Sequence, residues 1–147
     1  MADEQQHFLR LEVVSPDGLV FEGDVGMVVV PATGGEIGIL PRHAPLVAQL
    51  AIGELRVRTL GNETISLAVA DGFVKVQTDK VIVLADDAEL ASEIDEGKVI
   101  RARDRALANL AMWKEGKAPP GQERIFPARE MTALKTAENK LKVLHKA

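Results

Sequence analysis

The sequence predicts a mainly β chain of the α+β class, in which an N-terminal β-sandwich in residues 1–88 is followed by an antiparallel hairpin of two helices in residues 89–147. Two observations lead to this prediction. Up to residue 86, short runs rich in Val and Ile alternate with turn residues, as in all-β sandwiches and barrels. Beyond residue 90, Ala, Lys, Arg, Glu and Leu dominate, and apolar residues recur at helical spacing.

The expected strands are short and are separated by turns of recognisable chemistry. In the first turn, Pro16 presets φ and Gly18 tolerates a positive φ. In residues 54–60, charged side chains alternate with Leu55 and Val57, so one face of this strand should be wet and the other buried. The full set of expected strands comprises residues 8–14, 19–21, 25–30, 54–60, 64–70, 73–77 and 81–84.

Two of these runs, residues 27–30 and 81–84, are continuously apolar. Such a run fits a strand covered on both faces, either inside the sandwich or on one face by a partner. Between the two runs, the Gly-rich residues 34–38 are followed by neither Gly-Lys-Ser/Thr nor a helix, so we expect a turn rather than a phosphate loop. The wider segment 31–45 is either a plain β connection or a recognition loop that presents Glu36, Arg42 and His43.

Two helices are expected in the last third of the chain. Ser92 and Asp95 have the spacing of a capping box, and a break rich in Gly and Pro at residues 116–121 ends the first helix near Lys114. Pro127 suits the first position of the second helix. The apolar stripes are Val99, Ala102, Ala106, Leu110 and Trp113 in the first helix and Met131, Leu134, Ala137, Leu141 and Leu144 in the second.

The residue types that carry chemistry are scattered. The chain has no Cys, and His7, His43 and His145 lie in different segments, so the sequence supports no metal site. No serine has the context of a nucleophile elbow and no carboxylates are paired for acid and base roles, which disfavours catalysis. No apolar run approaches the ~20 residues that span a bilayer, and the N-terminus is acidic and polar, so we expect neither export nor a direct membrane anchor.

Charge is divided unevenly along the chain. Residues 1–90 hold six Lys and Arg against fourteen Asp and Glu, whereas residues 91–147 hold twelve against eight. The basic side chains of the tail form one cluster at Arg101, Arg103 and Arg105 and another that includes Lys135 and Lys140. Because aromatic side chains for base stacking are almost absent there, an acidic protein surface is a better expected partner than nucleic acid.

The run Gly35-Glu36-Ile37-Gly38-Ile39-Leu40-Pro41-Arg42-His43-Ala44-Pro45 resembles the F-type ATP synthase epsilon subunit of bacteria and chloroplasts. Other motifs of that family occur in the same order. They are Val14-Ser15-Pro16, Val20-Phe21-Glu22-Gly23, Val30-Pro31, Asp71-Gly72-Phe73-Val74-Lys75-Val76 and Val83-Leu84-Ala85-Asp86-Asp87-Ala88-Glu89. With the two-helix tail, the resemblance covers nearly the whole chain.

The resemblance implies a non-catalytic central-stalk rotor component of a proton-translocating enzyme, with no cofactor of its own. It implies that Glu36, Arg42 and His43 face the membrane ring of c subunits, while another part of the sandwich binds the gamma subunit. It also implies that the tail contacts the catalytic alpha/beta ring and inhibits ATP hydrolysis. The expected location is peripheral, on the cytoplasmic side of the bacterial inner membrane rather than on a chloroplast thylakoid. The tail residues implied in this contact are Arg101, Arg103, Arg105, Lys135 and Lys140.

Some members of that family bind ATP through an Ile-Asp-x-x-Arg-Ala motif, which gives an alternative function as a nucleotide-sensing module. Here Lys98 and Val99 replace the Arg and Ala, and Lys lacks the donor fork of Arg. The arginines that the second helix supplies in those members fall on Thr136 and Lys140. Tight ATP binding is therefore not expected, and the candidate ligands are Glu89, Asp95, Lys98 and Arg105.

Overall fold

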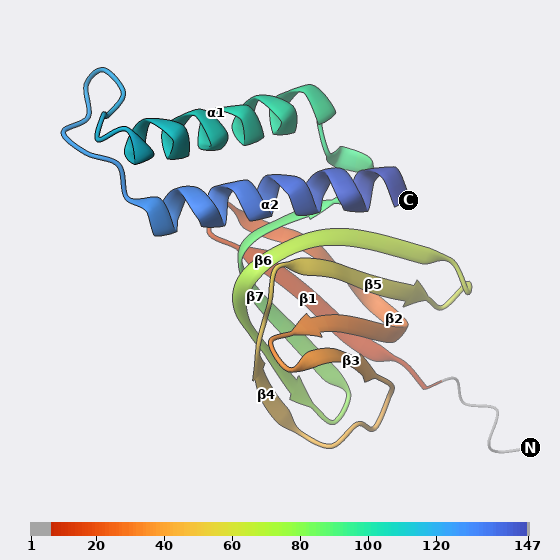
Figure 1. Cartoon of the computed structure of the whole chain (residues 1–147). Coiled ribbons are helices and arrows are strands. Elements are labelled where there is room, and N and C mark those ends of the chain that lie inside the picture. The colour runs from red at the N-terminus through yellow and green to blue at the C-terminus, as the bar shows by residue number, and fades with distance from the viewer. Residues whose placement is uncertain (1–6, 147) are drawn as a thin grey trace, which may run out of the picture. The chain divides into compact units, whose positions relative to one another are not determined.

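The computed structural model describes residues 7–146 and divides the chain into two compact units between Ala91 and Ser92. The first unit is a β-sandwich and the second is a helical hairpin, as Figure 1 shows, which confirms the predicted fold class. The division lies three residues beyond the boundary expected after residue 88, because the last strand continues to Leu90 instead of ending at Leu84.

The sandwich is a single seven-stranded sheet that closes on itself. Strand β1 pairs in parallel with β7 and antiparallel with β2, so that β1, β7, β6, β5 and β2 form a closed ring. Strand β3 is added outside β2, and β4 pairs with β6. Closure leaves few free strand edges, which protects the sheet from pairing with other chains. The strands are β1 (Leu9–Ser15), β2 (Gly18–Ala32), β3 (Gly35–Ile39), β4 (Leu46–Gln49), β5 (Gly53–Thr59), β6 (Thr64–Gln77) and β7 (Lys80–Leu90).

Alternating side chains of these strands point into one apolar core. Leu9, Leu11 and Val13 of β1 are fully buried, and so are Leu55 and Val57 of β5, which confirms the two faces predicted for residues 54–60. Each fully buried Val or Leu contributes about 1.5–3 kcal/mol relative to an exposed one. The core therefore provides the main stabilisation of this unit.

Two of the strands are longer than predicted. Residues 19–21 and 25–30 belong to one strand, β2, and residues 64–70 and 73–77 belong to another, β6. The sequence signal for a break in β6 came from Asp71 and Gly72, which have positive φ values of 54° and 112°. Pairing with β7 nevertheless continues on both sides of them, from Ala70 opposite Asp87 to Gly72 opposite Ala85. The positive φ values thus bend the strand without ending it.

Strands β3 and β4 were not predicted. The expected turn at residues 34–38 is wrong, because Gly35–Ile39 is a strand paired with β2 and only Thr33 and Gly34 form the turn. Both strands lie outside the ring and are only five and four residues long, too short to give a clear periodic signal in the sequence. The positive φ of 125° at Gly35 explains how the tight turn leads directly into β3.

The second unit consists of α1 (Glu96–Lys114) and α2 (Pro127–Lys146), preceded by the 3-10 turn Ala91–Glu93. The end of α1 at Lys114 and the start of α2 at Pro127 confirm the prediction. The capping box is wrong in part, because Ser92 lies in the 3-10 turn while the Asp95 side chain caps α1 by accepting from Lys98 N at 3.2 Å. Within residues 7–146, neither helix is long and apolar enough to cross a membrane.

The helices pack against each other along part of the predicted stripes. Val99 and Ala106 of α1 and Ala137 of α2 are buried. Ala102, Trp113 and Met131, which were predicted in the same stripes, remain exposed. Val143, outside the predicted stripe, is buried instead. The hairpin therefore buries only part of its apolar surface.

Candidate partner-binding sites

Residues 40–45 form a loop after β3 that backbone hydrogen bonds hold in place. The backbone N–H of Arg42 donates to Thr78 O at 3.0 Å and to Asp79 Oδ1 at 3.3 Å, which ties the loop to the β6–β7 turn. The N–H of His43 donates to Leu40 O at 3.1 Å. Arg42 adopts a positive φ of 67°, and its side chain is exposed while His43 is half-buried. Two of the three predicted contact residues are thus presented by one fixed loop.

Glu36, the third predicted contact, lies near the start of β3, whereas Arg42 and His43 follow its end. At about 3.3 Å per residue, the strand runs roughly 10 Å from Glu36 to its end at Ile39, and Arg42 and His43 lie beyond that end. The carboxylate of Glu36 is bound by a guanidinium: Arg56 Nη1 lies 2.9 Å from Oε2 and Arg56 Nη2 lies 3.3 Å from Oε1. Arg56 is therefore a member of this surface that sequence reasoning missed, since nothing local joins residues 20 positions apart.

Arg56 also contacts a second carboxylate, with Nη1 at 3.4 Å from Glu54 Oε1. The hydrogen bonds that Arg56 donates to Glu36 are the main cause that raises the pKa of Arg56 above its ordinary value. Burial of the guanidinium opposes this rise, and the hydrogen bond that it donates to Glu54 adds to it. The guanidinium stays charged in any case, so the cluster carries two negative charges and one positive charge.

A row of apolar side chains crosses the outer face of the sheet. The pairings Phe73 with Leu84, Leu84 with Val14, and Val14 with Leu19 place one residue from each of β6, β7, β1 and β2 side by side. Phe73, Leu84 and Leu19 are 57%, 54% and 57% exposed. We call these four residues the outer apolar row. Contiguous exposed apolar residues of this kind mark protein-binding surfaces.

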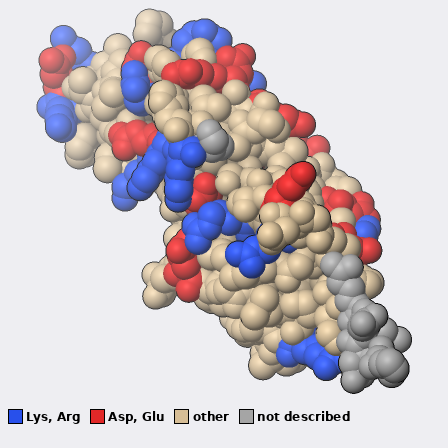
Figure 2. All heavy atoms as spheres, turned by 90° about the vertical axis from the view of Figure 1, so that its right-hand side faces the viewer, with Lys and Arg blue, Asp and Glu red and all other residues tan. Residues whose placement is uncertain are grey.

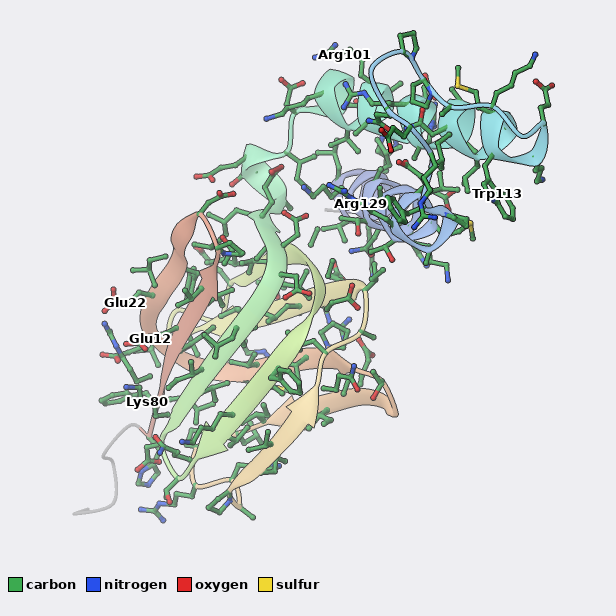
Figure 3. The ribbon with its side chains drawn as sticks, turned by 90° about the vertical axis from the view of Figure 1, so that its left-hand side faces the viewer. Glu12, Glu22, Lys80, Arg101, Trp113 and Arg129 are labelled. Carbon is green, nitrogen blue, oxygen red and sulfur yellow. The ribbon has the colours of Figure 1, made fainter. Side chains whose placement is uncertain are left out.

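Charged pairs border the outer apolar row. Lys80 Nζ of β7 lies 3.9 Å from Glu12 Oε2 of β1, and Arg10 of β1 pairs with Glu22 of β2. Figure 3 labels Glu12, Glu22 and Lys80 on these neighbouring strands. An apolar centre with a polar rim is the usual anatomy of a protein interface. The continuously apolar run 81–84 is the sequence signal for this surface. Val81 and Val83 lie in the core, whereas Leu84 faces outward. This arrangement fits the interpretation that a partner covers one face of the strand.

The basic residues of the hairpin do not form a single patch. Arg101 and Arg105 are four residues apart and share a face of α1, but Arg103 points elsewhere and pairs with Asp104 at 3.1 Å. Lys135 is exposed and Lys140 is half-buried on α2. Figure 2 shows basic and acidic side chains interspersed over the face of the hairpin that it presents. The basic residues are thus available at several places rather than in one cluster.

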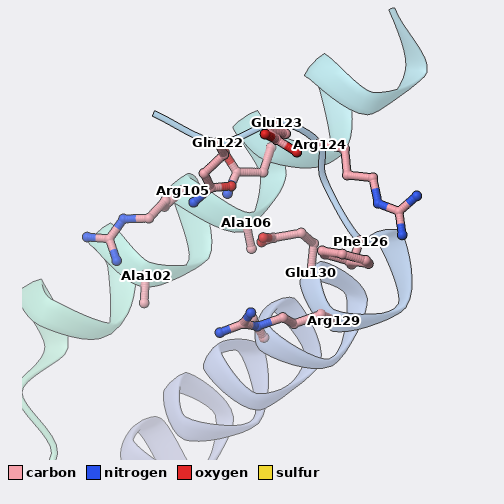
Figure 4. Close-up of a pocket in the computed structure, with 11 residues that line it drawn as sticks. Ala102, Arg105, Ala106, Gln122, Glu123, Arg124, Phe126, Arg129 and Glu130 are labelled. Atoms are coloured by element: carbon pink, nitrogen blue, oxygen red, sulfur yellow. The ribbon is translucent and has the colours of Figure 1, made fainter. Parts of the chain in front are cut away.

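A hollow of about 840 Å³ lies between α1, α2 and the loop that joins them (Figure 4). Ligand sites commonly have volumes of ~300–1,000 Å³. Three arginines line it, Arg105 from α1, Arg124 from the loop and Arg129 from α2, and the Arg124 guanidinium lies 4.8 Å from the centre of the Phe126 ring. The remaining lining residues are Ala102, Ala106, Asn109, Gln122, Glu123, Glu130 and Ala133.

The structure does not bring the four candidate ATP ligands together at this hollow. Arg105 lines the hollow, but Asp95 and Lys98 do not. The Asp95 side chain instead caps the start of α1 by accepting a hydrogen bond from Lys98 N. Glu89 belongs to β7 in the other unit. Arg124 and Arg129 were missed because the position of the loop depends on tertiary packing. Among residues 7–146, no three His, Asp or Glu side chains are grouped as a metal site.

Comparison with known proteins places similarity along nearly the whole chain. Residues 8–91 match the family model described as ATP synthase, delta/epsilon chain, beta-sandwich domain. The ATP synthase epsilon chain of Halalkalibacterium halodurans is 44% identical over 135 residues, which cover 92% of this chain and 96% of the relative. The epsilon chain of Dehalococcoides mccartyi is 42% identical over 138 residues, covering 94% and 93%.

A solved structure is similar over both units. A chain of the Euglena gracilis mitochondrial ATP synthase, in a structure of its OSCP, F1 and c-ring, superposes with a TM-score of 0.71 at 25% identity, covering 94% of this chain and 82% of that one. A chain from the central stalk and c-ring of the Tetrahymena thermophila mitochondrial enzyme has a TM-score of 0.50 at 12% identity, covers 94% of each chain, and shows likeness of fold alone.

Proposed function

The chain belongs to the family of ATP synthase epsilon chains, and on that premise we propose that it is a non-catalytic rotor component coupling the gamma subunit to the membrane ring of c subunits. The observation that carries this proposal is that one closed sandwich presents two different candidate binding surfaces. One is the outer apolar row and the other is the fixed loop with Arg42 and His43. A coupling part needs two such surfaces on a body that does not deform.

The outer apolar row is proposed as the gamma-binding surface. An apolar surface with a charged rim suits a permanent protein partner, and gamma is the rotor subunit that the resemblance implies. The double variant Phe73→Ser/Leu84→Ser should weaken binding of the full-length chain to gamma at least tenfold, because truncating central apolar anchors costs more than ~1 kcal/mol each. The control is Leu60→Ser, since Leu60 is 41% exposed but lies outside the row. Equal binding by both variants would contradict the assignment.

The loop at residues 40–45, together with Glu36, is proposed as the contact with the ring of c subunits. We propose that this contact keeps the chain peripheral at the cytoplasmic face of a bacterial inner membrane, a proposal supported by its similarity to the epsilon chains of two bacteria. The variant Arg42→Ala/His43→Ala should weaken binding of the full-length chain, with gamma, to purified rings. Unchanged affinity would remove the loop from this role.

The helical hairpin is proposed to restrain ATP hydrolysis through the catalytic alpha/beta ring. The net positive charge of residues 91–147 and the exposure of Arg101, Arg105 and Lys135 support this role. A chain ending at Ala91 keeps all seven strands, so its sandwich can still dock. Reassembled complexes with this shortened chain should hydrolyse ATP faster than complexes with the full chain. If the two rates agree under inhibitory conditions, the hairpin has no such role.

Nucleotide sensing is a second candidate function, and the hollow between the helices favours it. Three arginines around one cavity suit a polyphosphate, although Glu123 and Glu130 offset part of their charge. Calorimetry of the full-length chain with millimolar ATP tests the idea, and absence of heat would remove it. If ATP binds, Arg129→Ala should weaken binding more than Lys98→Ala, because Arg129 lines the hollow and Lys98 does not.

A further inference from the structure

We propose that Arg56 is a positioning residue that holds Glu36 and strand β3 in the orientation in which the sandwich meets the rotor ring. The inference rests on the proposed function, because contact of residues 36–45 with the ring is part of that proposal. Arg56 belongs to β5, two strands away from β3 in the sheet. It thus acts on the contact surface from outside the segment that forms it.

The geometry of the ion pair supplies the first argument. Both guanidinium Nη atoms engage Glu36, at 2.9 and 3.3 Å, which is the two-pronged arrangement that fixes a carboxylate in direction as well as in position. The register explains the reach. Glu36 pairs with Pro31, and Arg56 pairs with Val29 on the other side of β2, so the guanidinium extends across β2 to the edge strand.

The position of β3 supplies the second argument. In the part of the chain that the structure describes, β3 is hydrogen-bonded in the sheet to β2 alone and is five residues long. The ion pair is therefore a second attachment, located where the strand begins. At the other end, Arg42 N is held by Thr78 O at 3.0 Å. Residues 36–42 are thus secured at both ends, by Arg56 before and by the β6–β7 turn after.

Electrostatics supply the third argument. The side chain of Glu54 is only 12% exposed and that of Glu36 is 55% exposed, and Arg56 Nη1 lies within 3.4 Å of a carboxylate oxygen of each. Without Arg56 the two carboxylates would repel each other, and the more exposed one would turn away into solvent. The ring would then meet a mobile carboxylate instead of a fixed ion pair.

The test uses full-length chains that carry Arg56→Gln, which removes the charge, or Arg56→Lys, which keeps the charge but loses the fork. The matched control is Arg58→Gln. Arg58 is exposed two positions along the same strand, and no ion pair is found for it within residues 7–146. Hydrogen exchange of residues 35–45 should be about two- to fivefold faster in Arg56→Gln than in the control, and intermediate in Arg56→Lys. Affinity for purified rings, measured with gamma present, should fall in the same order.

The possible outcomes separate this inference from the proposal beneath it. Unchanged exchange in Arg56→Gln would overturn the positioning role, whatever the rings bind. Faster exchange with undiminished ring affinity would also overturn it if Arg42→Ala/His43→Ala weakens ring binding, since the loop would then work without the ion pair. If neither variant affects ring binding, the proposed ring contact itself fails and the inference fails with it. Faster exchange together with weaker binding supports both.

Discussion

The two units of the chain bury apolar surface to very different extents. The sandwich closes a ring of strands around one continuous core of Leu, Val, Ile and Ala side chains. In the hairpin the buried residues of the two helices are Val99, Ala106, Ala137 and Val143, and larger apolar side chains such as Leu107 and Trp113 stay exposed. Since helices in proteins owe most of their stability to packing, the hairpin is the weaker unit.

This difference suits a division of labour. A closed sheet with fixed surfaces suits the proposed coupling of two partners because it resists deformation, whereas a weakly packed hairpin can exchange between arrangements at a modest free-energy cost. The hairpin, with its smaller core, is therefore the unit better suited to the proposed regulation. Mutations in the sandwich should therefore cost more stability than mutations in the hairpin, and each should destabilise only the unit that carries it.

The largest effect is expected from Leu55→Ala in the sandwich. Removing a fully buried Leu side chain should lower the free energy of unfolding of this unit by about 2–5 kcal/mol. Denaturant-dependent hydrogen exchange of β5 and β6 measures the loss. Trp113, the single Trp of the chain, reports on the hairpin by fluorescence. If the unfolding transition of the hairpin shifts by as much as that of the sandwich, the two units unfold together and do not differ in stability as proposed.

The core of the sandwich was predictable because its signal is local. Leu55 and Val57 alternate with charged residues, and this pattern alone places them inside. The helix boundaries at Lys114 and Pro127 were equally local, since Gly and Pro determine them. The short strands β3 and β4 carry no such pattern, because their pairing partners and not their own sequence make them strands.

The candidate sites were predictable only in part. Arg42 and His43 followed from a contiguous motif, and the structure presents them on one loop. Arg56 could not be linked to Glu36, because the link depends on the register of β3, β2 and β5. Likewise, the hollow in the hairpin depends on how the connecting loop brings Arg124 beside the helices.

The second largest effect is expected from Gly72→Ala, which tests how rigid the bend in β6 is. At a φ of 112°, an added Cβ would lie 1.9 Å from Leu84 O, so the two strands must shift. We expect a loss of roughly 1–3 kcal/mol in the stability of the sandwich. Gly34→Ala is the matched control, because a Cβ there would meet no atom within 4 Å. Equal thermal unfolding of the two variants would show that the sheet yields at this point.

A smaller effect is expected from Asp95→Ala in the hairpin. This change removes the side-chain acceptor for Lys98 N at the start of α1, at a cost of about 1 kcal/mol in helix stability. Circular dichroism of the helices during mild denaturation should show earlier fraying, with little change in the exchange of the sandwich. Asp104→Ala serves as the control, since Asp104 lies in the middle of α1 and only pairs with Arg103 on the surface. Loss of sandwich stability in Asp95→Ala would contradict independent units.

The smallest effect concerns the contact between the first residue of α1 and the end of α2, where His145 Nε2 lies 3.0 Å from Glu96 Oε1. Both side chains are more than half exposed, so solvent screens their attraction and a coupling of only a few tenths of a kcal/mol is expected. A double-mutant cycle with Glu96→Gln and His145→Ala, followed by Trp113 fluorescence, measures this coupling, which should shrink further in 1 M salt. A salt-insensitive coupling above about 1 kcal/mol would mean that the hairpin is closed more firmly than its small core indicates.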